Sequence, residues 1–177
     1  MKQVYNFNPG PAMLPIAVMQ QAQKELLNWH NLGMSVMEVS HRGKEFKQLA
    51  AQSAQDLRDL LHVPQNYHIL FLQGGARSQF AMVPMNLLNG AKKAAYVRTG
   101  IWSDLAYEEA KIYCQADLVV DNKSHNYLDI PEQTSWKNLQ DAAFWHYCDN
   151  ETIHGVEFPY VPDSGEVPLV ADMSSNI

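Results

Sequence analysis

Apolar residues recur at helical spacing in the first third of the chain. Between Ile16 and about Trp29 the pattern predicts one helix, and Gly33 ends this region. A second helix is predicted from about Lys44 to Leu61, and Pro64 marks its end. The side chains expected to be buried are Val18, Ala22, Leu26 and Trp29 in the first helix and Phe46, Leu49, Ala50, Leu57, Leu60 and Leu61 in the second.

From residue 67 onward, short apolar runs alternate with helical patterns. The expected strands are Tyr67–Leu72, Ala94–Arg98, Leu118–Val120, Ala143–Cys148 and Leu169–Ala171, and the expected helices are Ser78–Leu88 and about Trp102 to Cys114. Strands that alternate with helices predict an α/β fold, with a mostly parallel sheet and helices on both faces. The polar stretch Asp121–Lys137 is expected to be a surface excursion.

Composition narrows the possible functions. A hydrophobic content of 46% and a charged content of 18% are typical of a soluble globular protein. The net charge of −6 argues against a general nucleic-acid or acidic-membrane binder, so we expect no partner of either kind. Cys114 and Cys148 have neither metal-ligand spacing nor a CxxC partner, and we expect free thiols, no bound metal and a cytoplasmic location.

The segment His68–Gln79 carries the strongest functional signal. An expected strand meets Gly74-Gly75, and a helix-forming segment with Arg77 in its first turn follows. Free N–H groups of a first helical turn, close backbone approach at glycine and a guanidinium together make a cradle for phosphate. The same residues are also compatible with an ordinary turn, because the segment lacks both G-x-G-x-x-G spacing and a P-loop ending.

Other chemistry-bearing residues also follow expected strands, and ligands of parallel sheets bind at the carboxyl ends of strands. Trp102 could stack on a flat ring or pack in the core. Thr152 could bind a ring substituent or cap a helix. Asp172 could cap a turn or keep a pyridine nitrogen protonated. A phosphate cradle, a stacking tryptophan and a carboxylate together suggest pyridoxal phosphate.

Six segments carry a resemblance to a known family. They are NFNPGPAMLP, SVMEVSHRGKEF, QGGARSQF, GIWSDLAYEEAKIYC, HYCDNETIHG and VADMSSNI. In this order they resemble the phosphoserine aminotransferases, which are class V, fold-type-I enzymes that depend on pyridoxal 5'-phosphate. The resemblance implies the aspartate aminotransferase-like fold, whose large domain has three layers, α/β/α. It also implies a homodimer.

The family exchanges an amino group between glutamate and 3-phosphohydroxypyruvate, giving phosphoserine and 2-oxoglutarate in serine biosynthesis, and in bacteria it often serves pyridoxine biosynthesis as well. By motif, Ala76 and Arg77 would hold the cofactor phosphate, and Trp102 would stack on its ring. Thr152 would contact the ring hydroxyl and Asp172 the ring nitrogen.

The same resemblance makes Arg42, with His41 beside it, a site for anionic groups of the substrate, whereas the residues alone favour a solvated helix entrance.

The family's Schiff-base lysine lies in a Gly-Ala-Gln-Lys-Asn context beyond the aspartate, and no such segment occurs in this sequence. Because that segment is missing, we expect residues 16–177 to be the N-terminal part of a truncated large domain, from a protein about twice as long. Residues 1–15 are rich in Pro and Gly, and we expect them to form an irregular lead-in. The chain alone is expected to be inactive. The alternatives are another class V aminotransferase, a cysteine desulfurase, or a non-catalytic module that binds a phosphorylated ligand.

Overall fold

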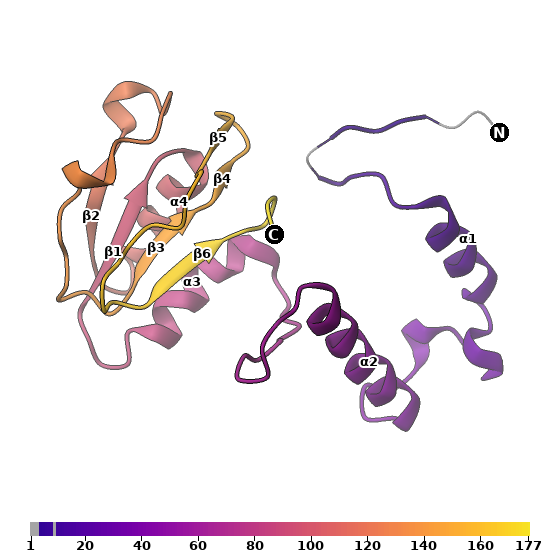
Figure 1. Cartoon of the computed structure of the whole chain (residues 1–177). Helices are drawn as coiled ribbons and strands as arrows, with labels where there is room; N and C mark the ends of the chain where they lie inside the picture. The colour runs from indigo at the N-terminus through magenta and orange to yellow at the C-terminus, as the bar shows by residue number, and fades with distance from the viewer. Residues whose placement is uncertain (1–3, 9) are drawn as a thin grey trace. The chain divides into compact units, whose positions relative to one another are not determined.

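The computed structural model describes residues 4–8 and 10–177, and the chain divides into two compact units, residues 1–71 and 72–177 (Figure 1). The first unit contains α1 (Ile16–Glu25), two 3-10 turns (Trp29–Asn31 and Val36–Glu38) and α2 (Lys44–Leu60). The lead-in has neither helix nor strand at residues 4–8 and 10–15, as expected, while residues 1–3 and 9 lie outside the described residues.

Both helices of the first unit form, but their predicted burial is wrong. Neither α1 nor α2 contains a buried residue, and the side chain of Leu60 is 75% exposed. Only Trp29 of the expected apolar faces is buried, and its ring stacks on that of His30 at 4.3 Å between centroids. The periodic pattern correctly identifies the helices, whereas burial depends on what packs against them, which the pattern does not specify.

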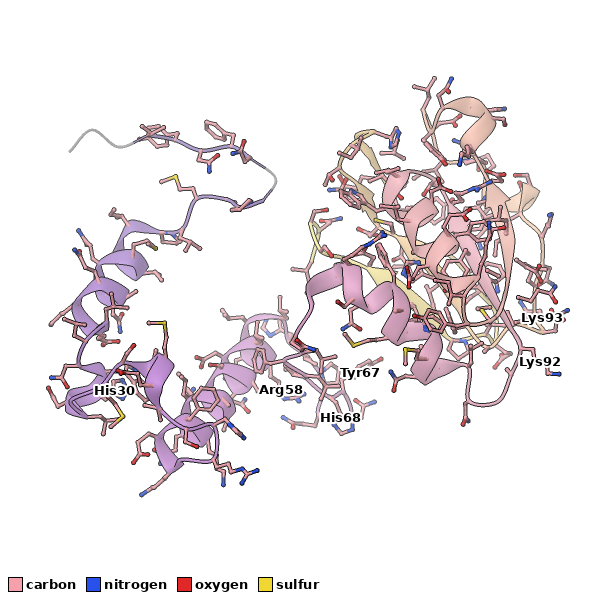
Figure 2. The ribbon with its side chains drawn as sticks, turned by 180° about the vertical axis from the view of Figure 1, so that it is seen from behind. His30, Arg58, Tyr67, His68, Lys92 and Lys93 are labelled. Carbon is pink, nitrogen blue, oxygen red and sulfur yellow. The ribbon has the colours of Figure 1, made fainter. Side chains whose placement is uncertain are left out.

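Arg58 fixes the chain that follows α2. Its guanidinium donates hydrogen bonds to three carbonyl oxygens, those of Val63 (3.2 Å), Pro64 (2.6 Å) and Tyr67 (3.0 Å). Figure 2 shows Arg58 beside Tyr67. One side chain therefore satisfies backbone acceptors that no regular secondary structure would satisfy.

The strand expected at Tyr67–Leu72 is wrong. These residues belong to neither sheet of the described chain, and the side chains of Leu70, Phe71 and Leu72 are 59–70% exposed. A β-strand exists only through hydrogen bonds to a neighbouring strand, and this segment pairs with none of the six strands in the described residues. Apolar composition alone therefore gave a false strand.

The second unit is built on a four-stranded parallel sheet in the order β2-β1-β3-β6 (Figure 1). The strands are β1 (Lys93–Arg98), β2 (Gln115–Asp121), β3 (Trp145–Cys148) and β6 (Leu169–Asp172). A separate short antiparallel pair, β4 (Asn150–Glu151) and β5 (Val156–Glu157), lies between β3 and β6 in the chain. Its helices are α3 (Gly75–Leu87) and α4 (Ile101–Ala110), with 3-10 turns at Lys123–His125 and Gln133–Ser135. The four sheet strands were predicted, with bounds shifted by a few residues.

The two faces of this sheet are covered differently. Ala94 and Tyr96 point to the face on which Phe80 of α3 and Ala106 of α4 pack. The alternate strand residues point to the opposite face. There they pack against irregular segments that include Ile130, Trp136, Leu139, Phe158 and Val167. Helices were expected on both faces, but in the described part of this unit the second face is covered by loops and a 3-10 turn.

Candidate cofactor site

The carboxyl ends of three neighbouring strands carry the candidate residues. β1 leads through Thr99 and Gly100 into α4, and β3 leads into the β4–β5 turn with Thr152. β6 ends at Asp172, which lies opposite Cys148 of β3 in the sheet register. Because the strands are parallel, these ends lie at one edge of the sheet, where such folds bind their ligands.

Trp102 and Thr152 form a direct pair at this edge. The indole Nε1–H of Trp102 donates a hydrogen bond to Oγ1 of Thr152 at 2.9 Å, and both residues are half-buried. The two were predicted separately from positions 50 residues apart, and the structure joins them. The indole orientation is therefore set by the β4–β5 turn.

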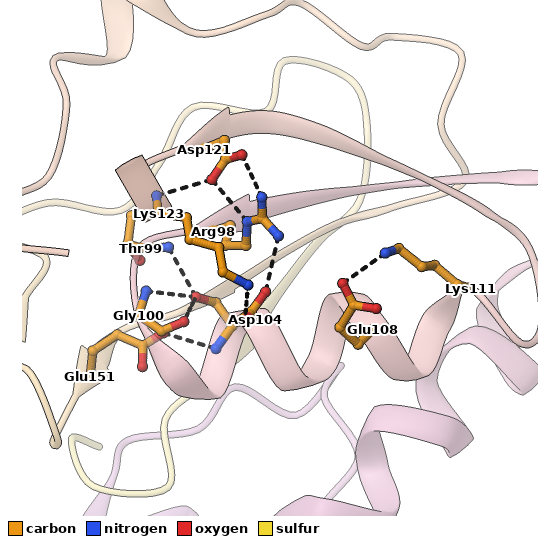
Figure 3. Close-up of polar contacts among 10 residues, drawn as sticks. Arg98, Thr99, Gly100, Asp104, Glu108, Lys111, Asp121, Lys123 and Glu151 are labelled. Carbon is orange, nitrogen blue, oxygen red and sulfur yellow. Dashed lines mark hydrogen bonds and ion pairs between the residues drawn. The ribbon is translucent and has the colours of Figure 1, made fainter. Parts of the chain in front are cut away.

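Glu151 is a buried carboxylate that caps α4. Its side chain is 0% exposed, and it accepts hydrogen bonds from the backbone N–H groups of Trp102 (2.8 Å) and Ser103 (2.9 Å). A carboxylate at a helix N-terminus gains from both the unpaired N–H groups and the helix dipole. Figure 3 shows Glu151 beside Gly100 at the start of the helix.

Gly100 is required by this arrangement for reasons of space. A Cβ at this position would lie 2.3 Å from the carboxyl carbon of Glu151, and the extended backbone (φ −175°) imposes no such requirement. Ser103 completes the cap, since its Oγ accepts hydrogen bonds from the N–H groups of Thr99 and Gly100, both at 3.0 Å. The N-terminus of α4 is thus satisfied from within the chain.

The N-terminus of α3 differs, because its N-cap residue is Gly74 and no side chain within residues 4–8 and 10–177 caps it. Gly74 and Gly75 have φ values of +92° and +60°, a left-handed conformation that favours glycine, so the turn expected here is confirmed. Ala76 and Arg77 are exposed in the first turn of the helix, and the Arg77 guanidinium lies 5.6 Å from the ring centroid of Phe80. The backbone N–H groups of this turn are the ones available to an anion.

A cavity of about 330 Å³ lies between α3 and the ends of β3 and β6. Its lining includes Ala76, Phe80, His146, Asp172 and Ser174. One oxygen of Asp172, Oδ1, accepts hydrogen bonds from the N–H (3.1 Å) and the hydroxyl (2.6 Å) of Ser174. The cavity therefore joins two of the predicted residues, one from the helix and one from the strand.

His146 forms the buried wall of this cavity. Burial lowers the pKa of its imidazole to about 4, although the nearby carboxylate of Asp172 acts in the opposite direction. The ring stacks on Tyr96 at 5.3 Å between centroids, and its Nδ1 has no hydrogen-bond partner in the described residues. The imidazole is therefore neutral at physiological pH.

His41 and Arg42 belong to the first unit. Both are exposed in the turn that precedes α2, where the N–H of Arg42 donates a hydrogen bond to Oγ of Ser40 at 3.3 Å. Their association with the residues of the second unit stays a prediction.

Residues 4–8 and 10–177 contain no group of three or more His, Cys, Asp or Glu side chains that could hold a metal ion. Within the same described residues, no helix combines the length and the apolar character needed to cross a membrane.

The sequence model of the class-V aminotransferases matches residues 4–177. The chain belongs to this family. Its most similar relatives include the phosphoserine aminotransferase of Coxiella burnetii (strain Dugway 5J108-111), which is 54% identical over 177 residues, covering 100% of this chain and 49% of that protein. The phosphoserine aminotransferase of Acidithiobacillus ferrooxidans (strain ATCC 53993 / BNL-5-31) is 53% identical over 174 residues, which are 98% of this chain and 48% of the relative.

Solved structures of family members share the fold. A pyridoxal-phosphate-bound phosphoserine aminotransferase from Trichomonas vaginalis matches with a TM-score of 0.93 and 43% identity, over 99% of this chain and 49% of that one. The enzyme from Bacillus circulans subsp. alkalophilus matches with a TM-score of 0.90 and 42% identity, over 97% of this chain and 47% of that one. The predicted family and α/β fold class are thereby confirmed, and the chain spans about half the length of the curated relatives it matches.

The sequence did not predict that Glu151 caps α4, or that Gly100 leaves the space for its carboxylate. One signal was present: a helix that starts after Gly100 has no side chain at its N-cap, so any side-chain cap has to come from elsewhere in the chain. The pattern did not say from where.

Proposed function

We propose that the whole protein to which this chain belongs is a phosphoserine aminotransferase, exchanging an amino group between glutamate and 3-phosphohydroxypyruvate. The observation that carries this proposal is the identity of 54% with a phosphoserine aminotransferase across all 177 residues. The relatives named above favour this activity over a cysteine desulfurase or another class V aminotransferase, and over a module that only binds a ligand.

The residues at the sheet edge suit pyridoxal 5'-phosphate. We assign its phosphate to the first turn of α3, with Ala76 and Arg77, because this helix start has no side-chain cap among the described residues, while that of α4 is filled by Glu151. When bound, the cofactor supplies a protonated ring that withdraws electrons from the amino acid attached to it. Arg77 adds a fixed cation with two N–H donors for the phosphate.

Asp172 is assigned to the ring nitrogen. Ser174 engages one carboxylate oxygen and thereby holds the group in place, while the other oxygen makes no hydrogen bond within the described residues. A carboxylate facing the nitrogen keeps it protonated. His146, neutral and buried beside it, excludes water from that side without adding a competing positive charge.

Trp102 is assigned to stack on the ring and Thr152 to contact the ring hydroxyl. Since Thr152 Oγ1 already accepts the indole N–H, its hydroxyl proton is left to be donated to the ring oxygen. Arg42 and His41 are assigned to anionic groups of glutamate, 2-oxoglutarate, phosphoserine or 3-phosphohydroxypyruvate.

The remaining features of the proposal follow the family. We propose a cytoplasmic homodimer in serine biosynthesis, with pyridoxine biosynthesis as a second role, and residues 16–177 as part of one cofactor-binding domain. Because the sequence holds no lysine in the Gly-Ala-Gln-Lys-Asn context, the chain itself is expected to bind the cofactor without efficient turnover. Robust production of phosphoserine and 2-oxoglutarate from 3-phosphohydroxypyruvate and glutamate by the 177-residue chain would contradict this expectation.

A titration with pyridoxal phosphate tests the proposed site, with tryptophan fluorescence as the signal. We expect saturable quenching, weakened about tenfold or more by Arg77→Ala, since a phosphate–guanidinium interaction contributes roughly 1.5–3 kcal/mol. Lys93→Ala is the matched control, because it removes a cation from the opposite end of β1, where Lys93 pairs with Asp141 at 2.6 Å. Equal affinities of the two variants would refute the assignment of Arg77.

A further inference from the structure

Glu151 connects two segments that carry proposed ring contacts. Its side chain holds the start of α4 through the N–H groups of Trp102 and Ser103. Its own carbonyl oxygen accepts hydrogen bonds from His154 (3.1 Å) and Gly155 (2.8 Å), which close the turn that follows Thr152. One residue therefore anchors the helix on one side and the turn on the other.

Trp102 is held at two points by this arrangement. Glu151 fixes its backbone N–H at 2.8 Å, and Thr152, the next residue in the chain, fixes its indole N–H at 2.9 Å. The two contacts close a ring of interactions around a carboxylate that is 0% exposed. Moving the carboxylate would release the backbone of α4 and shift the helix relative to Thr152.

We propose that Glu151 is a positioning residue, which sets the orientation of the Trp102 indole and the Thr152 hydroxyl toward the cofactor ring. This inference rests on the proposed function for what the pair contacts, while the role of Glu151 in holding the pair concerns the cofactor-free chain. The carboxylate supplies two acceptor oxygens to two N–H donors, and a carboxamide supplies only one. Glu151→Gln therefore keeps the volume and loses one of the two contacts.

The orientation can be measured in the 177-residue chain by nitrogen-15 NMR of the indole N–H groups. Thr152→Val, which removes the acceptor at nearly constant volume, identifies the Trp102 resonance and gives its position without the hydrogen bond. We expect Glu151→Gln to move the Trp102 resonance toward its position in Thr152→Val. An unmoved resonance in Glu151→Gln would overturn the proposal.

Asn122→Asp is the matched control. Asn122 is 1% exposed, and its Nδ2 donates to the backbone oxygen (2.7 Å) and to Oδ1 (2.8 Å) of Asp129. Like Glu151→Gln, this substitution preserves volume and disrupts buried hydrogen bonds, here the two that Asn122 donates to Asp129, neither of which involves α4. We expect it to leave the Trp102 resonance in place. A shift as large as that caused by Glu151→Gln would show a general loss of structure and overturn the proposal.

Pyridoxal phosphate affinity is the second readout. We expect Glu151→Gln to raise the dissociation constant for pyridoxal phosphate about tenfold and Asn122→Asp to change it less than about twofold. If the parent chain shows no saturable binding, that result counts against the proposed function, and the cofactor-free spectra still decide the role of Glu151. Equal weakening by both variants would overturn the positioning role.

The parent chain provides a measurement that does not depend on any variant folding. If Glu151 holds α4, the backbone N–H groups of Trp102 and Ser103 and the indole N–H of Trp102 exchange with solvent slowly and together, because they open as one unit. Rapid exchange of the Trp102 and Ser103 amides, against slow exchange in the neighbouring β1, would overturn the proposal.

Discussion

Replacing Gly100 with alanine should destabilise the second unit through a single collision. The added Cβ would lie 2.3–2.5 Å from three side-chain atoms of Glu151, distances at which something must move. The backbone at Gly100 is extended, so alanine can adopt it without strain. The cost therefore arises from displacing a carboxylate that is 0% exposed and makes two hydrogen bonds.

The magnitude follows from those two bonds. Each hydrogen bond to a charged group contributes roughly 1.5–3 kcal/mol, so losing both costs on the order of 3–6 kcal/mol. The lower chain entropy of alanine in the unfolded state offsets about 0.4–1 kcal/mol of this. We expect Gly100→Ala to lower the free energy of unfolding by at least about 2 kcal/mol after both effects.

Urea denaturation of four chains tests this reasoning: the parent, Gly100→Ala, Glu151→Ala and the double variant. With Glu151 shortened, the collision disappears, and Gly100→Ala should then raise stability by about 0.4–1 kcal/mol. The expected coupling energy is at least about 2 kcal/mol. A coupling below about 0.5 kcal/mol, the level of independent sites, would refute the steric explanation.

Three further outcomes are expected. The free energy of unfolding should fall by about 3 kcal/mol as pH drops from 6.5 to 4, because the pKa of buried His146 is about 4 and the unfolded state therefore takes up a proton at higher pH than the folded state. Urea denaturation at a series of pH values should show that His146→Phe lacks this part of the loss. Arg98→Lys should cost about 1–3 kcal/mol in urea denaturation, because the guanidinium bridges Asp104 and Asp121, and an unchanged midpoint would contradict that. Iodoacetamide should modify Cys114 before Cys148, whose burial raises its pKa more, as peptide mass spectrometry can determine; equal rates would be inconsistent with the burial.

Local patterns predicted what local physics determines. The four sheet strands and the helices α1 to α4 were found because side-chain periodicity and breaker residues act within a few positions. The segment Tyr67–Leu72 was assigned wrongly, since its composition is that of a strand and its pairing is not. The burial expected in α2 was wrong for the same reason, because burial needs a partner surface.

The candidate site shows the same division. Trp102, Thr152 and Asp172 could be singled out because each follows a strand and carries a recognisable chemical group. Glu151 could not, since its role depends on contacts with residues 48 and 49 positions away. Those contacts arise only when the ends of β1 and β3 come together in the sheet.

The close approach of Gly100 and Glu151 also bears on how the family can vary. The volume available at one position is what the other leaves free, so a mutation that adds a side chain at Gly100 is tolerated only after Glu151 has become smaller. Such a change requires passing through a chain that has already lost the cap of α4. Among descendants that retain this helix start, the two positions should therefore change together or not at all, and we expect glycine and glutamate to be inherited as a pair.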